Sequence, residues 1–184
     1  MFADPVQEIE RAPELQVTEW LNTKSPISLK GLLGRPVIIH AFQMLCPGCV
    51  SHAIPQTQNV QRIFEQTDLA VLGLHTVFEH HAAMTPVSLR AFVHEYRLTF
   101  PIGVDHPGET GPTPRTMAAY QMRGTPTTIL IDRKGCISAQ LFGQIEDLAL
   151  GAMIQALLSE HIQSAGDTDP RDVCTPNGCS DPSF

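Results

Sequence analysis

Apolar residues occur along the chain in short runs that predict β-strands. The run at 36–42 is continuous and rich in β-branched residues, which is typical of a strand buried on both faces. The run at 69–77 has the same character, whereas 15–20 alternates apolar and polar positions. The pattern predicts strands at 15–20, 36–42, 69–77, 100–104, 127–132 and 136–142, with a hairpin turn at 132–135.

Segments between these strands show the three- and four-residue spacing of amphipathic helices. In 50–66, Val50, Ala53 and Ile54 share one face, and Pro55 predicts a kink. Further helices are predicted at 88–96, 115–122 and 145–162. Strands that alternate with helices predict an α/β domain, with parallel strands joined by helical crossovers and an antiparallel hairpin at one edge.

Composition and charge narrow the class of protein. The chain has 184 residues, 42% of them hydrophobic, which suffices for one domain with a single core, predicted at 1–163. The remainder, 164–184, is rich in Gly, Asp, Pro, Ser and Thr, which predicts a flexible tail. A net charge of −7 argues against nucleic acid or an anionic membrane as partner, since both bind basic patches. Without a basic secretory leader or a long apolar run, we expect a cytoplasmic protein, or a periplasmic one if a leader has been removed.

The chain has five cysteines, four of them in the close pairs Cys46/Cys49 and Cys174/Cys179. They are too few for the disulfide framework of a small secreted domain, so close pairs indicate redox chemistry or metal binding.

The sequence Cys46-Pro47-Gly48-Cys49 stands between a predicted buried strand and a predicted helix. A cysteine at a helix N-terminus has a lowered pKa, because unpaired N–H groups and the helix dipole favour the thiolate. Proline is favoured at the first helical position, where its missing N–H costs nothing. We therefore predict that Cys46 is the exposed nucleophile and Cys49 the more buried resolving thiol.

Further motifs support a specific resemblance. They are Ala12-Pro13-Glu14-Leu15, Ser28-Leu29-Lys30-Gly31-Leu32, Phe100-Pro101-Ile102-Gly103-Val104-Asp105 and the stretch at 120–135 that contains Gly124-Thr125-Pro126-Thr127. Together with the Cys-x-x-Cys pair they make residues 12–160 similar to the thioredoxin superfamily, in its TlpA/ResA-like and AhpC/TSA redoxin branch.

The resemblance implies a thioredoxin-like fold and a thiol–disulfide oxidoreductase without cofactor or metal. A protein disulfide or dithiol would be its substrate, and a second protein its redox partner. In that family the proline at the position of Pro126 is cis and lies against the active disulfide, and the backbone of the residue before it, here Thr125, pairs with the substrate chain. Pro47, Gly48, Thr125 and Pro126 are therefore expected to contact the substrate.

Two positions depart from the family pattern. Leu45 stands where these proteins have tryptophan before the first cysteine, which affects substrate preference rather than chemistry. His40 stands where thioredoxin has a buried acid, and an imidazole there is a candidate base for the Cys49 proton. The alternative is a core histidine that is hydrogen-bonded to the backbone.

Other functions stay open. Peroxidases of this branch have a threonine three residues before the reactive cysteine, where this chain has Gln43. A metal-binding module that uses both cysteine pairs is a second alternative, although zinc sites usually lie on turns between short strands. Cys174 and Cys179 are also a possible electron relay to the active site, because a flexible tail from residue 163 could span the distance.

Overall fold

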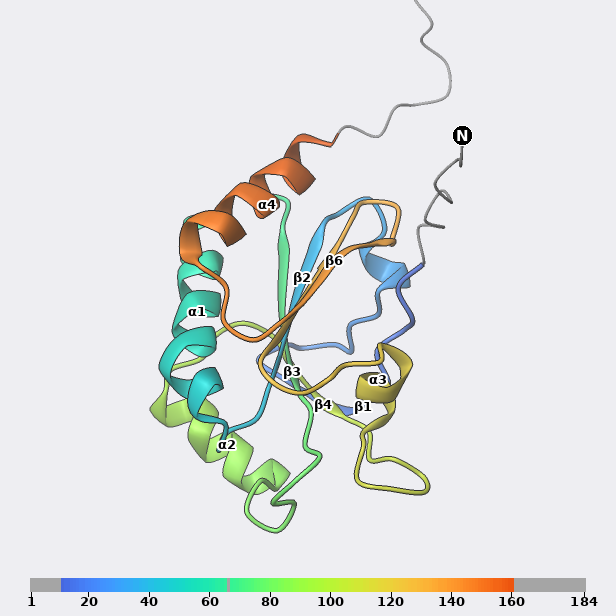
Figure 1. Ribbon diagram of the computed structural model, residues 1–184, viewed down its shortest axis with the longest axis vertical. Helices are drawn as coiled ribbons and strands as arrows, with labels where there is room; N and C mark the ends of the chain where they lie inside the picture. The colour runs from blue at the N-terminus through green and yellow to red at the C-terminus, as the bar shows by residue number, and fades with distance from the viewer. Residues whose placement is uncertain (1–10, 66, 161–184) are drawn as a thin grey trace, which may run out of the picture.

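The computed structural model describes residues 11–65 and 67–160, whose strands form a six-stranded sheet in the order β1-β4-β3-β2-β5-β6 (Figure 1). The strands are β1 (Val17–Leu21), β2 (Val37–Phe42), β3 (Ala70–His75), β4 (Ile102–Asp105), β5 (Thr127–Ile131) and β6 (Ile137–Phe142). β2, β3 and β4 are parallel, and β5 and β6 form an antiparallel hairpin next to β2. The predicted α/β domain with a mixed sheet is confirmed, but the opposite edge is antiparallel too, since β1 runs against β4.

Helices cover both faces of the sheet. Figure 1 shows α1 (Ile54–Ile63), α2 (Pro86–Glu95) and α4 (Asp147–Ser159) on one side and α3 (Arg115–Ala119) on the other. α2 begins two residues earlier than predicted, because the Thr85 hydroxyl caps it by accepting a hydrogen bond from the Ser88 amide, 3.3 Å away. α3 is shorter than predicted, since Gln121 has a φ of 50° and leaves the helical conformation.

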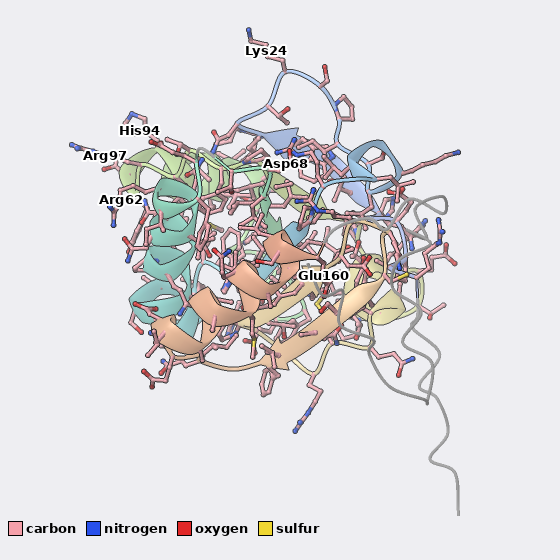
Figure 2. The ribbon with its side chains drawn as sticks, turned by 90° about the horizontal axis from the view of Figure 1, so that it is seen from above. Lys24, Arg62, Asp68, His94, Arg97 and Glu160 are labelled. Atoms are coloured by element: carbon pink, nitrogen blue, oxygen red, sulfur yellow. The ribbon has the colours of Figure 1, made fainter. Side chains whose placement is uncertain are left out.

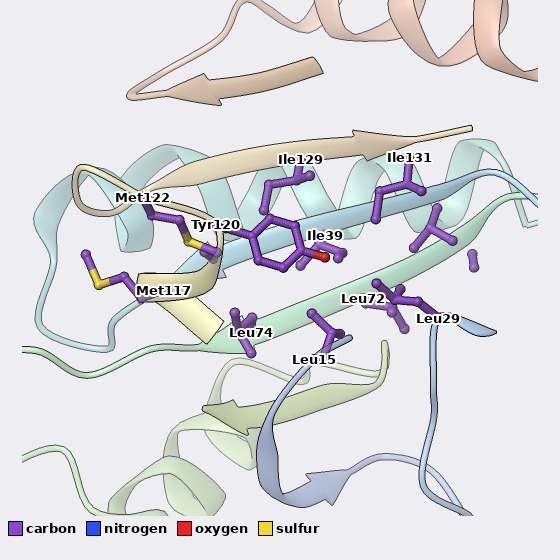
Figure 3. Close-up of a cluster of buried hydrophobic side chains, with 13 residues drawn as sticks. Leu15, Leu29, Ile39, Leu72, Leu74, Met117, Tyr120, Met122, Ile129 and Ile131 are labelled. Carbon is purple, nitrogen blue, oxygen red and sulfur yellow. The ribbon is translucent and has the colours of Figure 1, made fainter. Parts of the chain in front are cut away.

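The central strands are buried on both faces, as their continuous apolar runs predict. Alternate residues of β2 enter different clusters: Ile39 faces α3, whereas Ile38 faces α1 and α4. The cluster on the α3 side includes Leu15, Leu29, Ile39, Leu72, Leu74, Met117, Tyr120, Met122, Ile129 and Ile131 (Figure 3). Charged side chains such as Lys24, Arg62 and Arg97 project outward instead (Figure 2).

The predicted hairpin turn forms around the side chain of Asp132. Its carboxylate accepts hydrogen bonds from the amides of Lys134 (2.9 Å) and Cys136 (2.8 Å). Gly135 has a φ of 81°, a conformation that costs glycine little. The turn therefore results from local chemistry that is visible in the sequence.

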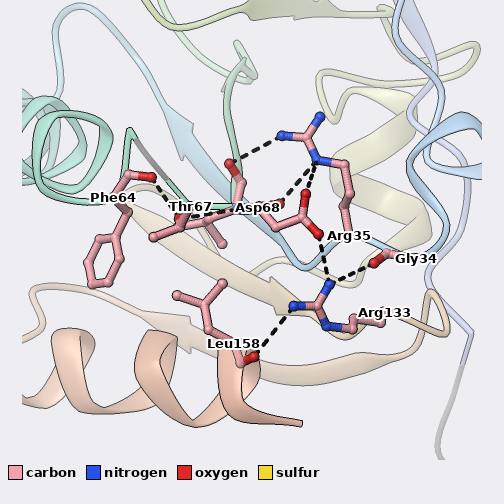
Figure 4. A network of polar contacts seen from close by, with 8 residues as sticks. Gly34, Arg35, Phe64, Thr67, Asp68, Arg133 and Leu158 are labelled. Carbon is pink, nitrogen blue, oxygen red and sulfur yellow. Dashed lines mark hydrogen bonds and ion pairs between the residues drawn. The ribbon is translucent and has the colours of Figure 1, made fainter. Parts of the chain in front are cut away.

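Arg133, in the same turn, ties together segments that are distant in the chain (Figure 4). It donates to the carbonyls of Gly34 (2.8 Å) and Leu158 (3.4 Å), and its guanidinium lies 3.0 Å from an Asp68 carboxylate oxygen. Asp68 is more than half exposed, so its ion pair with Arg133 contributes little to the stability of the fold. Most of the stabilisation by Arg133 comes from its hydrogen bonds to the two carbonyls.

We expect Arg133→Met to lower the free energy of unfolding by about 1–2 kcal/mol, because it removes hydrogen bonds that a charged donor makes to the end of α4 and to Gly34. Urea denaturation would measure the change. Lys134→Met removes the same charge from an exposed position of the turn and should have little effect. Equal losses in both variants would contradict this role.

The sequence also led to predictions about a membrane-spanning segment, the end of the domain and the C-terminal tail. None of the helices in the described part of the chain has the length and hydrophobicity that a bilayer crossing requires. The predicted domain limit at 163 and the tail at 164–184, with Cys174 and Cys179, lie outside the described residues.

Candidate active site

Cys46 directly precedes a helical segment that starts at Pro47, where the chain leaves the end of β2. The Val50 amide donates to the Cys46 carbonyl (3.1 Å), and the Cys49 amide lies 3.3 Å from Cys46 Sγ. Cys46 Sγ is thus placed like the side-chain oxygen of an N-cap, which accepts a hydrogen bond from the third helical amide. A thiolate at this sulfur would be stabilised by that N–H group and by the helix dipole.

The two cysteines differ in environment. Cys46 is partly exposed, whereas Cys49 is fully buried, and both are free thiols. Burial, and to a smaller extent a hydrogen bond with the Cys46 side chain, raises the pKa of Cys49 to about 12. The arrangement gives one accessible sulfur and, one helical turn away, a second sulfur held in its protonated form.

The predicted helix after Cys49 departs from regular α-helical geometry just before Pro55. Residues Cys49–Ala53 form a π-helical turn, η2, in which the Ile54 amide donates to the Cys49 carbonyl five residues earlier. α1 then begins at Ile54, with Pro55 in its first turn, where a missing N–H is tolerated. The extra residue of the π-helical turn accommodates the proline, a device that α-helical spacing alone could not predict.

Thr125 and Pro126 lie beside the cysteines. The Thr125 carbonyl is 3.5 Å from Cys46 Sγ, and the Thr125–Pro126 peptide bond is cis. A Cβ added to Gly48 would lie 3.6 Å from Pro126 Cδ, so the Cys-x-x-Cys turn and this proline are in contact. The tertiary structure thus brings together Cys46 and Thr125, which are 79 residues apart in the sequence.

The side chain of Gln43, which lies three residues before Cys46, contacts Thr125. Its side chain is buried, and its Nε2 lies 3.3 Å from Thr125 Oγ1 and 3.4 Å from a Glu79 carboxylate oxygen. The Phe78 amide donates to its Oε1 (3.4 Å). Gln43, which occupies the position of the peroxidase threonine, therefore points its amide at the Thr125 loop and not at Cys46.

His40 is buried on the sheet face that also carries Phe42, a member of the cluster around Cys49. Its Nδ1 lies 3.2 Å from Thr128 Oγ1, and its Nε2 has no partner among the described residues. Burial, and to a smaller extent the nearby charge of His52, lower the pKa of His40 to about 4. The imidazole is therefore neutral at pH 7, and no hydrogen bond joins it to either cysteine in the described structure.

His52 and Gln56 were missed by sequence reasoning. Both contact the carbonyl of Ile145, His52 through Nε2 (2.9 Å) and Gln56 through Nε2 (2.8 Å). Gln56 also donates to an Asp147 carboxylate oxygen (2.6 Å). These contacts attach the active-site helix to the start of α4. The only signal was a histidine one turn after Cys49, which also fits an ordinary helix surface.

Two alternatives from the sequence concern a metal site and an electron relay. Among residues 11–65 and 67–160, no group of three or more His, Cys, Asp and Glu side chains could hold a metal ion. A zinc site or an electron relay that uses Cys174 and Cys179 lies outside the described residues.

Known proteins resemble this chain over most of its length. A profile of the AhpC/TSA family matches residues 9–140. Protein DipZ of Mycobacterium bovis is 28% identical over 169 residues, which are 90% of this chain but only 23% of DipZ. Thiol-disulfide oxidoreductase ResA of Bacillus anthracis is 26% identical over 145 residues, 78% of this chain and 75% of ResA.

Solved structures give the same indication. A thiol-disulfide isomerase from Corynebacterium glutamicum is 46% identical, with a TM-score of 0.77 that covers 82% of this chain and 98% of that protein. A thioredoxin-like superfamily protein is 58% identical, with a TM-score of 0.80, and covers 82% and 97% of the two chains.

Proposed function

Because the chain belongs to the AhpC/TSA family, within the thioredoxin superfamily, we propose that it is a thiol–disulfide oxidoreductase whose Cys46/Cys49 pair exchanges with a disulfide or dithiol in a protein substrate. One observation carries the proposal. Cys46 Sγ lies between the Cys49 amide (3.3 Å) and the Thr125 carbonyl (3.5 Å), with the buried Cys49 thiol behind it.

In the reducing direction, the Cys46 thiolate attacks one sulfur of a substrate disulfide. A bond forms between the two sulfurs, the substrate disulfide breaks, and its second sulfur leaves as a thiolate that takes up a proton. Cys49 then loses its proton and attacks Cys46 Sγ, which forms the Cys46–Cys49 disulfide and releases the first substrate sulfur to be protonated. Two electrons and two protons pass to the substrate, and a dithiol of a redox partner protein restores the pair by the reverse steps.

Thr125, Pro126, Pro47 and Gly48 are the proposed substrate-contacting residues. The substrate backbone would pair with Thr125 as an added strand, which places its disulfide over Cys46. The 3.5 Å separation of the Thr125 carbonyl from Cys46 Sγ supports this placement. The same steps run backwards when the substrate is a dithiol, so the partner proteins determine the direction. The cytoplasmic location stays a prediction.

The proposed function is tested with oxidised and reduced protein in defined thiol buffers. We expect the Cys46/Cys49 disulfide to form under mild oxidant and to equilibrate with dithiothreitol, and we expect the reduced pair to reduce the disulfides of insulin. Failure of the two sulfurs to bridge would contradict the proposal. Rapid consumption of hydrogen peroxide would instead favour a thiol peroxidase, and stoichiometric zinc in purified protein a metal-binding module.

His40 is the proposed acceptor of the Cys49 proton. Its buried imidazole is neutral at pH 7 and its Nε2 has no partner within the described structure, so a proton can bind there, although the lowered pKa of about 4 makes the resting imidazole a weak base. We expect His40→Asn, which can keep a hydrogen bond to Thr128, to slow resolution of the mixed disulfide by about 10²-fold and its formation much less.

The two steps can be followed separately with Ellman's reagent in a Cys136→Ser/Cys174→Ser/Cys179→Ser background. The first thionitrobenzoate is released when Cys46 is modified, and the second when Cys49 resolves the adduct. Equal slowing of both releases in His40→Asn would leave His40 as a packing residue only.

A further inference from the structure

A cavity of about 530 Å³ adjoins the active site between the end of β6 and the start of α4. Apolar side chains form much of its wall, among them Leu141, Phe142, Ile145 and Met153. Gln144, also in the wall, places its Nε2 3.9 Å from the position that a Gly48 Cβ would occupy. Gln144 therefore connects the wall of the cavity with the Cys-x-x-Cys turn.

Arg123 lies at this cavity with its charge unneutralised. Arg123 is exposed, and its guanidinium carbon is 5.4 Å from the centre of the Phe142 ring, which makes a cation–π contact. No carboxylate forms an ion pair with it within the described residues. Phe142 is 51% exposed and packs against Gly124, where an added Cβ would lie 3.0 Å from the ring. Phe142 at the end of β6 and Arg123 in the loop before β5 thus present an aromatic ring and a cation close to Thr125.

Glu146 is the one acidic residue of the cavity wall, and it stands at the start of α4. A substrate carboxylate is therefore favoured beside Arg123, and apolar substrate groups fit the part of the cavity between Arg123 and Glu146. Arg123 precedes Thr125 by two residues, and an extended chain advances about 3.3 Å per residue. A substrate side chain within about three positions of the reactive cysteine can reach the guanidinium.

We propose that this cavity selects the protein substrate, with Arg123 binding an Asp or Glu and the apolar wall receiving a neighbouring hydrophobic side chain, both within about three positions of the reactive cysteine. The inference rests on the proposed thiol–disulfide exchange and names its substrate class. The observation that supports it is a cation without an ion-pair partner in the described residues, which stands beside the apolar part of a mixed wall.

Disulfide-containing peptides test the proposal. Peptides that differ only by Glu, Gln or Lys, placed one, two or three residues from the cysteine on either side, would be reduced by the full chain, and kcat/KM compared. At the best position we expect Glu to exceed Lys by about fivefold or more, in line with an exposed ion pair. Arg123→Gln should bring the ratio close to one, and Arg123→Glu should invert it.

Lys24→Gln is the matched control, since Lys24 loses the same charge from an exposed loop after β1 and lines no part of this cavity (Figure 2). It should keep the Glu/Lys ratio of the unmodified protein. A ratio that Arg123→Glu leaves unchanged would overturn the inference, as would an unmodified protein without preference at any position. The insulin assay separates the two proposals: if the unmodified protein reduces insulin but shows no preference among the peptides, only this inference fails, and if it reduces neither insulin nor any peptide, the exchange function fails.

Discussion

Replacing Cys46 by serine is expected to slow the exchange with a protein disulfide by about 10³-fold or more, because the proposed nucleophile is lost. Cys49→Ser should keep the first attack and stop there. The partly exposed Cys46 sulfur still has the residue-49 amide, 3.3 Å away, and the N-terminal end of the helix to stabilise its thiolate. The variant should therefore accumulate a covalent complex with its substrate, detectable on non-reducing gels and by mass spectrometry.

Cysteine content allows a clear control. Cys136→Ser removes the remaining free cysteine of the described residues, on β6's side of the hairpin turn, and should leave the exchange rate unchanged. Cys174→Ser and Cys179→Ser, tested in turn, show whether the second pair relays electrons. Exchange by Cys46→Ser at the rate of the unmodified protein, or a trapped complex that persists without Cys46, would overturn the assignment of the nucleophile.

Mild acid is expected to destabilise the fold through His40 and His75. Burial, together with the nearby charge of His52 in the case of His40, lowers the pKa of each from 6.5 to about 4. Because the unfolded chain binds protons near pH 6.5 and the folded chain does not, the stability from these groups is complete above pH 6.5 and is lost as the pH falls toward 4. Each histidine accounts for about 3 kcal/mol over this range.

Urea denaturation at pH 7, 6, 5 and 4 would measure this loss. His75→Leu should reduce it by about half, since the His75 ring packs on Phe42 and its Nε2 has no partner in the described structure. The exposed His94→Gln should not change it. Asp105 acts in the opposite sense, because burial raises its pKa, so only the difference between variants isolates the histidines. The same pH dependence in His75→Leu and in the unmodified protein would contradict the assignment.

The central strands could be predicted from sequence because their burial leaves a direct pattern. A strand such as β2, covered on both faces, needs apolar side chains at nearly every position, and the run at 36–42 provides them. The Asp132 turn was predictable for a similar reason, since its hydrogen bonds join residues two and four positions apart. Helix boundaries were less predictable. Thr85-Pro86 starts α2 by a capping bond that hydrophobic spacing does not show.

The sequence alone determined that Cys46 and Cys49 lie together and so the chemistry proposed for the site, because local geometry brings together two cysteines three residues apart at a helix start. Only the tertiary structure decided what surrounds them. The Thr125 carbonyl reaches Cys46 because β5 pairs with β2, and the Arg123–Phe142 pair reaches the same place because β6 pairs with β5. Such contacts depend on strand order and register, which burial of the whole sheet selects and no short stretch of sequence encodes.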